Sequence, residues 1–247
     1  MMNQYSTPNS LVELQENIRE IQQQVNAICQ KIGRNPAEVR LLPVTKTLPI
    51  ERIEQAYQLG FHCFGENKVL EAKDKYEALQ HLPIHWILIG HLQTNKVKYV
   101  AKFIGEFHAL DSIKLAEKLN HRLALEQRTL PVFIQVNTSN EQSKFGVRPE
   151  QTLCLIEHCQ QFPQLKIIGL MTLAIHSQDP VEVRRCFQTL RLLRDDIQKI
   201  YPEIQRLSMG MSGDFEIAIE EGATDIRVGQ AIFGARALPD HYYWPEQ

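Results

Sequence analysis

The chain has 247 residues, of which 43% are apolar and 23% charged, and its formal net charge is −2. This length and composition suit a folded protein with a sizeable core, either one large domain or two small ones. The near-neutral charge, without a basic run interleaved with aromatic residues, argues against nucleic-acid binding, and no apolar stretch reaches the roughly 20 residues of a membrane span. We therefore expect a small-molecule ligand and neither a nucleic-acid nor a membrane partner.

The five cysteines are odd in number and form no CxxC pair. Neither a disulfide framework nor a zinc site is predicted from them, and no metal is expected. Residues 1–10 are polar and lack the charged leader and apolar core of an export signal. Together these features predict a cytoplasmic protein.

A long helix is predicted first, with Ser10 and Glu13 as a capping box at its start and Gly33 near its end. Its apolar residues recur at three-four spacing, namely Leu11, Leu14, Ile18, Ile21, Val25 and Ile28. A seam this short favours a helix packed on its own domain over a coiled coil. The chain is accordingly expected to be a monomer.

Beyond this helix, apolar and β-branched runs alternate with amphipathic stretches of helical length. The strand candidates are 39–45, 61–65, 85–89, 106–110, 131–137, 166–173, 205–209 and 225–228. The run at 131–137 is continuously apolar, which is typical of a parallel strand covered on both faces. Eight such units predict one domain over residues 1–247, an α/β fold that is a single (β/α)8 TIM-type barrel with an extra N-terminal helix, and the strand count disfavours a doubly wound open sheet.

Ligands of such barrels bind at the carboxyl ends of the strands, so the residues there are site candidates, and most of them are polar. They are Lys46, Glu66, Asn67, His91, Gln93, Asp111, Ser112, Asn137, Met171, Thr172, Ser208, Arg227 and Gly229.

The loops after the last two strands are typical of phosphate sites. The 208–213 loop, with Met211, Ser212 and Gly213, combines hydroxyls with glycines and leads into a helix predicted at 214–221. Arg227 and Gly229 add a cation and a second glycine turn. In the alternative interpretation Ser212 merely caps its helix, whose early acidic residues repel an anion.

Lys46 directly follows a buried apolar strand. Desolvation there would favour the neutral, nucleophilic amine, whereas a lysine that extends out of the barrel into water would be inert. A lysine amine facing a phosphate site is what a Schiff base with pyridoxal 5′-phosphate (PLP) requires. A Schiff-base aldolase acting on sugar phosphates requires the same two features, so both remain open.

Longer motifs resemble those of the pyridoxal phosphate homeostasis proteins, a PLP-binding family related to the barrel domain of fold-type III enzymes such as alanine racemase. The motifs are Val44-Thr45-Lys46-Thr47, Phe64-Gly65-Glu66-Asn67, Trp86-Ile87-Leu88-Ile89-Gly90-His91-Leu92-Gln93-Thr94-Asn95-Lys96, Ser143-Lys144-Phe145-Gly146, Leu207-Ser208-Met209-Gly210-Met211-Ser212 and Ile226-Arg227-Val228-Gly229. With shorter matches between them, they span nearly the whole chain in the family's order.

The resemblance implies a Schiff base between PLP and Lys46, with Asn67 lining the pocket. It places the phosphate on Ser208, Met211, Ser212 and Gly213 and on the turn formed by Arg227 and Gly229. Arg227 resembles the arginine that faces the pyridine nitrogen in the related racemases. Because a guanidinium keeps its proton, the ring nitrogen would stay unprotonated and the ring would be a poor electron sink.

Those racemases also use a tyrosine from a separate β-domain, whereas the tyrosines of this chain are predicted in helices, connections or tails. Tyr242 and Tyr243 are expected to anchor the tail, His91 to be hydrogen-bonded scaffolding and Lys144 to be solvated. The resemblance thus implies a PLP carrier or buffer in PLP, amino-acid and keto-acid homeostasis, with PLP-dependent apoenzymes as candidate recipients and no catalytic residue. A single-domain PLP-dependent amino-acid racemase is the alternative.

Overall fold

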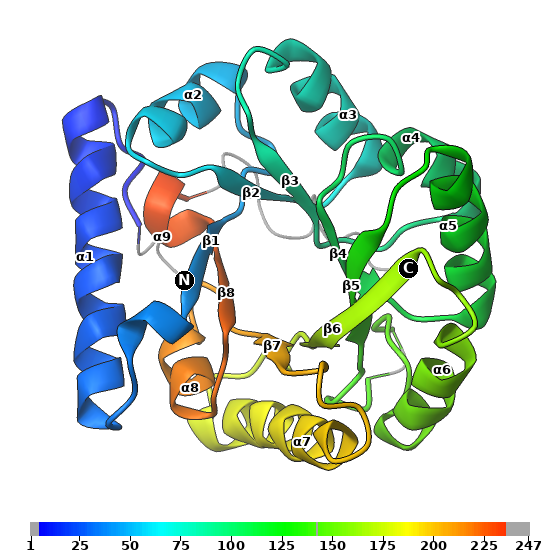
Figure 1. Cartoon of the computed structure of the whole chain (residues 1–247). Helices are drawn as coiled ribbons and strands as arrows, with labels where there is room; N and C mark the ends of the chain where they lie inside the picture. The colour runs from blue at the N-terminus through cyan, green and yellow to red at the C-terminus, as the bar shows by residue number, and fades with distance from the viewer. Residues whose placement is uncertain (1–4, 142, 236–247) are drawn as a thin grey trace.

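A computed structural model describes residues 5–141 and 143–235, and in it eight parallel strands form a barrel ringed by helices (Figure 1). The strands are β1 (Arg40–Pro43), β2 (Cys63–Glu66), β3 (His85–Leu88), β4 (Glu106–Leu110), β5 (Leu130–Gln135), β6 (Leu165–Met171), β7 (Arg206–Ser208) and β8 (Asp225–Val228). The helices are α1 (Leu11–Lys31), α2 (Ile50–Gln58), α3 (Val69–Ala78), α4 (Val97–Val100), α5 (Ile113–Leu125), α6 (Thr152–Cys159), α7 (Pro180–Gln198), α8 (Phe215–Glu220) and α9 (Gln230–Phe233).

The barrel closes through β1, which pairs with β8 along its length and with β2 through the single bridge between Val44 and Gly65. The predicted TIM-type barrel and all eight predicted strands are confirmed. The bounds of β4 and β8 are as predicted. Most of the other strands are shorter, because an apolar run continues into the rim of the barrel after the ladder of its neighbour has ended.

Helix α1 begins as the sequence predicts, with the Ser10 hydroxyl accepting from the Glu13 amide at 3.2 Å. The reciprocal half of the capping box is wrong, because the Glu13 carboxylate accepts from the Asn9 amide, at 2.7 Å, instead of from Ser10. The apolar face of α1 packs against α8 and α9 at the side of the barrel (Figure 1). The predicted packing of this helix on its own barrel is confirmed.

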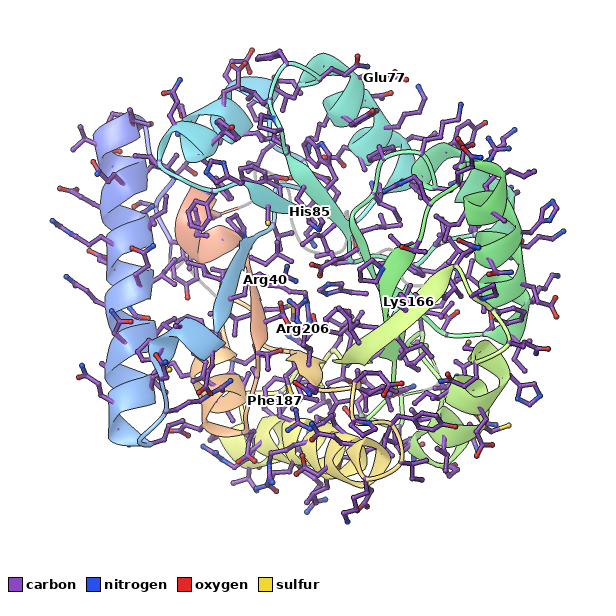
Figure 2. All side chains as sticks on the ribbon, in the orientation of Figure 1. Arg40, Glu77, His85, Lys166, Phe187 and Arg206 are labelled. Carbon is purple, nitrogen blue, oxygen red and sulfur yellow. The ribbon has the colours of Figure 1, made fainter. Side chains whose placement is uncertain are left out.

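The inside of the barrel is charged at the amino ends of the strands. Arg40, Glu106, Arg206 and Asp225 each begin a strand, and we call these four residues the charged layer. Arg40 donates to both Glu106 oxygens, at 2.7 and 2.6 Å, and to Asp225 at 2.5 Å, while Arg206 also pairs with Asp225. Figure 2 shows Arg40 and Arg206 within the ring of strands and Glu77 at the outer edge. Two cations and two anions thus replace the branched apolar residues usual in such barrels.

Because side chains alternate along a strand, the residue two positions after each member of the charged layer also faces inward. Leu42, His108, Ser208 and Arg227 occupy that next layer, and three of these four residues are polar. Beyond β7, Gly210 packs closely on α8, where a Cβ atom would lie 2.6 Å from the Cβ of Ala218. The interior therefore changes from ion pairs at the amino ends of the strands to mostly hydrogen-bonding groups further along them.

Every helix within residues 5–141 and 143–235 is too short or too polar to cross a lipid bilayer. In the same part of the chain, no three histidine, cysteine or acidic side chains converge to hold a metal ion.

Candidate functional site

Lys46 lies just past β1 and is half-buried at the mouth of the barrel. The pairing of β1 continues beyond its last residue, since the Val44 amide donates to Val228 and the Thr45 amide to Gly65, at 2.9 and 3.0 Å. Arg40 faces the interior, and alternation from Arg40 places Lys46 on the same inward side. This position is the one that the sequence predicts for a reactive amine.

The backbone on both sides of Lys46 is held by a buried cluster between β1, β2 and α3. Lys75 donates to the Thr45 carbonyl at 2.6 Å and to one oxygen each of Glu66 and Glu71, at 2.8 and 2.6 Å. Glu71 also accepts from the amide of Thr47, which has a φ of +65° that a β-branched residue rarely adopts. The Lys75 and Glu66 side chains are 5% and 1% exposed. Burial raises the pKa of Glu66 more than Lys75 and Thr45 lower it.

Asn67 follows β2 and is packed tightly against the end of β3. A Cβ atom at Gly90 would lie 2.1 Å from the Asn67 carbonyl oxygen and 2.5 Å from its side-chain oxygen. Only glycine allows this approach, so the position of Asn67 depends on Gly90.

We expect Gly90→Ala to lower the free energy of unfolding by about 1–3 kcal/mol, because the new methyl group forces the Asn67 backbone to move. Chemical denaturation of the purified protein measures this effect. Gly213→Ala is the matched control, since a Cβ there has no neighbour within 4 Å and the apoprotein should keep its stability. Equal stability of the two variants would contradict the packing role of Gly90.

The 208–213 loop presents open backbone at the mouth. Within the described part of the chain, the amides of Ser212 and Gly213 make no backbone hydrogen bond. The Ser212 hydroxyl accepts from the Ala231 amide at 3.2 Å and so joins this loop to the start of α9. Ser212 therefore does not cap α8, and Asp214, which precedes that helix, accepts from the Met211 amide at 2.5 Å.

Arg227 is the buried cation of the mouth and is 3% exposed. Its two terminal nitrogens donate to the Ser208 hydroxyl at 2.8 Å and to the Thr172 carbonyl at 2.9 Å. Burial lowers the pKa of Arg227 to about 10, although Asp214 and Asp225 raise it, so the guanidinium stays charged at neutral pH. The predicted fixed cation beside the glycine turn is present.

His108, which no sequence motif singles out, is fully buried on β4 beside Ser208. Its Nδ1 lies 2.9 Å from the Ser208 hydroxyl and its Nε2 lies 3.0 Å from Glu106. The residue sits in the middle of an apolar strand, and the only available signal was its two-residue spacing from Glu106. Burial lowers the pKa of His108 below its ordinary value of 6.5, although Glu106 raises it.

We predict that the stability conferred by neutral His108 is complete above about pH 6.5 and is lost as the pH falls below that value. The reason is that His108 of the unfolded chain then binds a proton, whereas His108 of the folded protein, with its lowered pKa, stays neutral. The free energy of unfolding should fall by up to about 1.4 kcal/mol per pH unit below that value. Denaturation at a series of pH values checks this slope. His108→Asn should flatten it, whereas His121→Asn, at an exposed histidine, should not; equal slopes in both variants would refute the assignment.

Tyr5 also reaches the site, since its hydroxyl donates to the Ser212 carbonyl at 2.8 Å. Burial raises the pKa of Tyr5, and Glu216 raises it further. No sequence pattern links a residue near the amino terminus to a loop more than 200 positions away. Tyr242 and Tyr243, the predicted tail anchors, lie outside the described residues.

His91 and Lys144 lie at the rim. The His91 ring stacks on Phe145 with centroids 3.9 Å apart, and its Nδ1 is 3.5 Å from Asp111, in agreement with a scaffolding role. The prediction that Lys144 is solvated is wrong, because its ammonium group donates to the Ala174 carbonyl at 2.8 Å and pairs with Glu141. These contacts tie the loop after β5 to the end of β6.

The residues predicted to bind PLP follow four strands that are neighbours around the barrel, β7, β8, β1 and β2. Gly229 lies against the end of β1, where a Cβ would be 3.3 Å from the Val44 carbonyl oxygen. An inward amine, a buried cation and open amides therefore meet at one mouth. Such a set can hold a small aldehyde that carries a phosphate group.

Comparisons with known proteins agree with the fold and define its class. The family model described as "Alanine racemase, N-terminal domain" matches residues 11–237. An alanine racemase from Corynebacterium glutamicum has the same fold at 16% identity, with a TM-score of 0.73 over 96% of this chain and 66% of that one.

Closer relatives share a name. The pyridoxal phosphate homeostasis protein of Aquifex aeolicus is 41% identical over 90% of this chain and 97% of its own length, and that of Escherichia coli K12 is 35% identical over 91% and 97%. PipY of Synechococcus elongatus, solved with PLP bound, is 33% identical, with a TM-score of 0.76 over 85% of this chain and 100% of that one. This chain therefore belongs to the pyridoxal phosphate homeostasis protein family.

Proposed function

We propose that this chain binds PLP as a Schiff base on Lys46 and carries or buffers it in the cytoplasm, as a monomer of one domain, for PLP-dependent apoenzymes. The observation that carries the proposal is the meeting of Lys46, Arg227 and the open amides of the 208–213 loop at one barrel mouth. The PLP-bound structure of PipY supports it.

The residues present fit the groups of PLP one by one. The Lys46 amine condenses with the aldehyde and releases water, and the cluster around Lys75 keeps the backbone of Lys46 in place. Open amides at Ser212 and Gly213, with the Gly229 turn, would hold the phosphate, and Met211 would cover it from the rim. Arg227 would face the ring nitrogen and Asn67 would line the pocket. PLP supplies the aldehyde and the electron-withdrawing ring.

Storage and transfer are favoured over turnover by the character of these groups. Arg227 keeps its charge and so leaves the ring nitrogen without a proton. Among the described tyrosines, Tyr5 is the one whose hydroxyl contacts the site loop, and it donates there to a backbone carbonyl. The curated relatives are named for homeostasis and not for a reaction. Within the described residues, the site thus holds groups that can bind the aldehyde, while the tyrosine hydroxyl that contacts it is engaged with a backbone carbonyl.

The proposal is tested by transfer. The chain is loaded with PLP, freed of excess ligand and mixed with a PLP-dependent apoenzyme, and the recovered activity of that enzyme is followed over time. In a parallel sample, a dialysis membrane separates the two proteins. Recovery that is faster in the mixed sample supports direct transfer. Solvent deuterium exchange at the α-carbon of supplied amino acids, abolished by Lys46→Ala, would instead favour the racemase alternative.

A further inference from the structure

Arg227 is connected to the charged layer by a continuous chain of side-chain hydrogen bonds through the barrel. Arg227 contacts the Ser208 hydroxyl at 2.8 Å, and Ser208 contacts His108 at 2.9 Å. His108 contacts Glu106 at 3.0 Å, and Glu106 is held by Arg40. Ser208 and His108 have no exposed surface. Since water does not reach these two groups, each must use the others as partners.

The proton positions along this series of hydrogen bonds follow from the chemistry of Glu106 and Arg227, the groups at its two ends. Burial raises the pKa of Glu106, but hydrogen bonds from His108, His85 and Arg40 outweigh it and hold that pKa well below its usual range. The Glu106 carboxylate can therefore only accept, so the Nε2 of His108 carries the proton. The pKa of His108 is lowered by burial, so its Nδ1 is unprotonated and accepts from the Ser208 hydroxyl. The Ser208 oxygen is left to accept from Arg227.

Every link then donates in one direction, from the guanidinium at the mouth toward the carboxylate at the other end. Bonds aligned in this way polarise one another in a low-dielectric interior. The opposite tautomer of His108 would turn a nitrogen lone pair toward the Glu106 carboxylate. It would also leave the Ser208 hydrogen competing with the Arg227 donor.

We infer that His108 is a positioning residue for the cofactor, which acts through Ser208 to fix the plane of the Arg227 guanidinium and so the N–H that it presents to the pyridine ring. The inference rests on the proposed PLP site. Two hydrogen bonds define that plane, one to Ser208 and one to the Thr172 carbonyl at 2.9 Å. Without the acceptor at His108, the Ser208 hydroxyl turns to other partners and one of these two anchors is lost.

Two variants distinguish the effect of the hydrogen bond between His108 and Ser208 from that of the bond between His108 and Glu106. His108→Asn keeps an oxygen near the place of Nδ1 and so keeps an acceptor for Ser208, while it loses the bond to Glu106. His108→Gln keeps a donor near the place of Nε2 for Glu106 and disrupts the bond to Ser208. Both variants lose the imidazole ring, whose centroid lies 4.0 Å from that of the Phe133 ring. The packing loss is therefore shared, and a difference between the variants reports on Ser208.

PLP is titrated into the unmodified chain and both variants, and the dissociation constant and the visible spectrum of the bound cofactor are measured. We expect His108→Gln to bind at least about tenfold more weakly, as the loss of a charge-assisted bond implies, and to shift the spectrum. His108→Asn should stay close to the unmodified chain in both readouts. Equal effects of the two variants, with binding to the unmodified chain intact, would overturn this inference and leave the proposed function standing. Absence of binding to the unmodified chain would overturn both.

A second measurement uses the unmodified apoprotein, so it requires neither PLP nor a variant. Nitrogen NMR of the histidine rings in the unmodified apoprotein at neutral pH reports the tautomer of each ring. We expect His108 to be neutral with its proton on Nε2. A proton on Nδ1, or a charged ring, would overturn the inference.

Discussion

Replacing Glu106 by glutamine should lower the free energy of unfolding by about 3 kcal/mol or more, as is typical when one partner is removed from a buried ion pair. The Glu106 side chain is 9% exposed and accepts from both terminal nitrogens of Arg40 and from His108. The amide keeps the shape of the carboxylate but leaves Arg40 and Arg206 with Asp225 as the one remaining anion of the charged layer. The variant is compared with the unmodified apoprotein by chemical denaturation.

Glu77→Gln is the matched control. Glu77 pairs with Lys73 at 2.8 Å on the outer surface of α3, where the glutamate side chain is 51% exposed (Figure 2). Solvent screens such a pair, so this variant should unfold like the unmodified chain. If Glu106→Gln proved as stable as Glu77→Gln, the charged layer would not stabilise the barrel.

Replacing Lys46 by alanine should abolish the visible absorption of bound PLP and the strong binding that accompanies it. The covalent bond to the cofactor is formed by this amine, while the phosphate contacts of the 208–213 loop contribute only reversible binding. The fold should be unaffected, because Lys46 is half-buried at the rim and the buried cluster around Lys75 does not need its amine. Absorption spectra during a PLP titration measure the effect.

Lys144→Ala serves as the matched control, since it removes another lysine of the rim whose ammonium group contacts the Ala174 carbonyl and Glu141. This variant should retain the absorption. A Lys46→Ala protein that still developed the full visible band would show that the Schiff base forms elsewhere.

The order and type of most elements were predictable because most strands lie within apolar runs and the longer helices have an amphipathic period. The loop after β7 could be recognised as a candidate phosphate site, since its glycines and hydroxyls lie next to one another in the sequence. Strand ends were less so: 39–45 reads as one strand, whereas β1 ends at Pro43 and continues only as a bridge.

What the sequence did not reveal are the partners that the fold brings together from distant positions. Lys75 looks like one more charged residue of an amphipathic helix, and its burial beneath Lys46 depends on how α3 packs on the barrel. His108 looks like a core residue of β4, and its contact with Ser208 spans 100 positions. A loop lysine such as Lys144 is usually solvated, whereas here its ammonium group donates to the Ala174 carbonyl, three residues past the end of β6.

The Schiff base on Lys46 is tested most sharply by locating the cofactor on the chain. The protein is mixed with PLP, reduced with borohydride to make the bond permanent, digested and mapped by peptide mass analysis. We expect a phosphopyridoxyl group on Lys46, which lies just past the carboxyl end of β1. A chain modified chiefly at another lysine, such as Lys75 or Lys144, or not modified at all, would contradict this expectation.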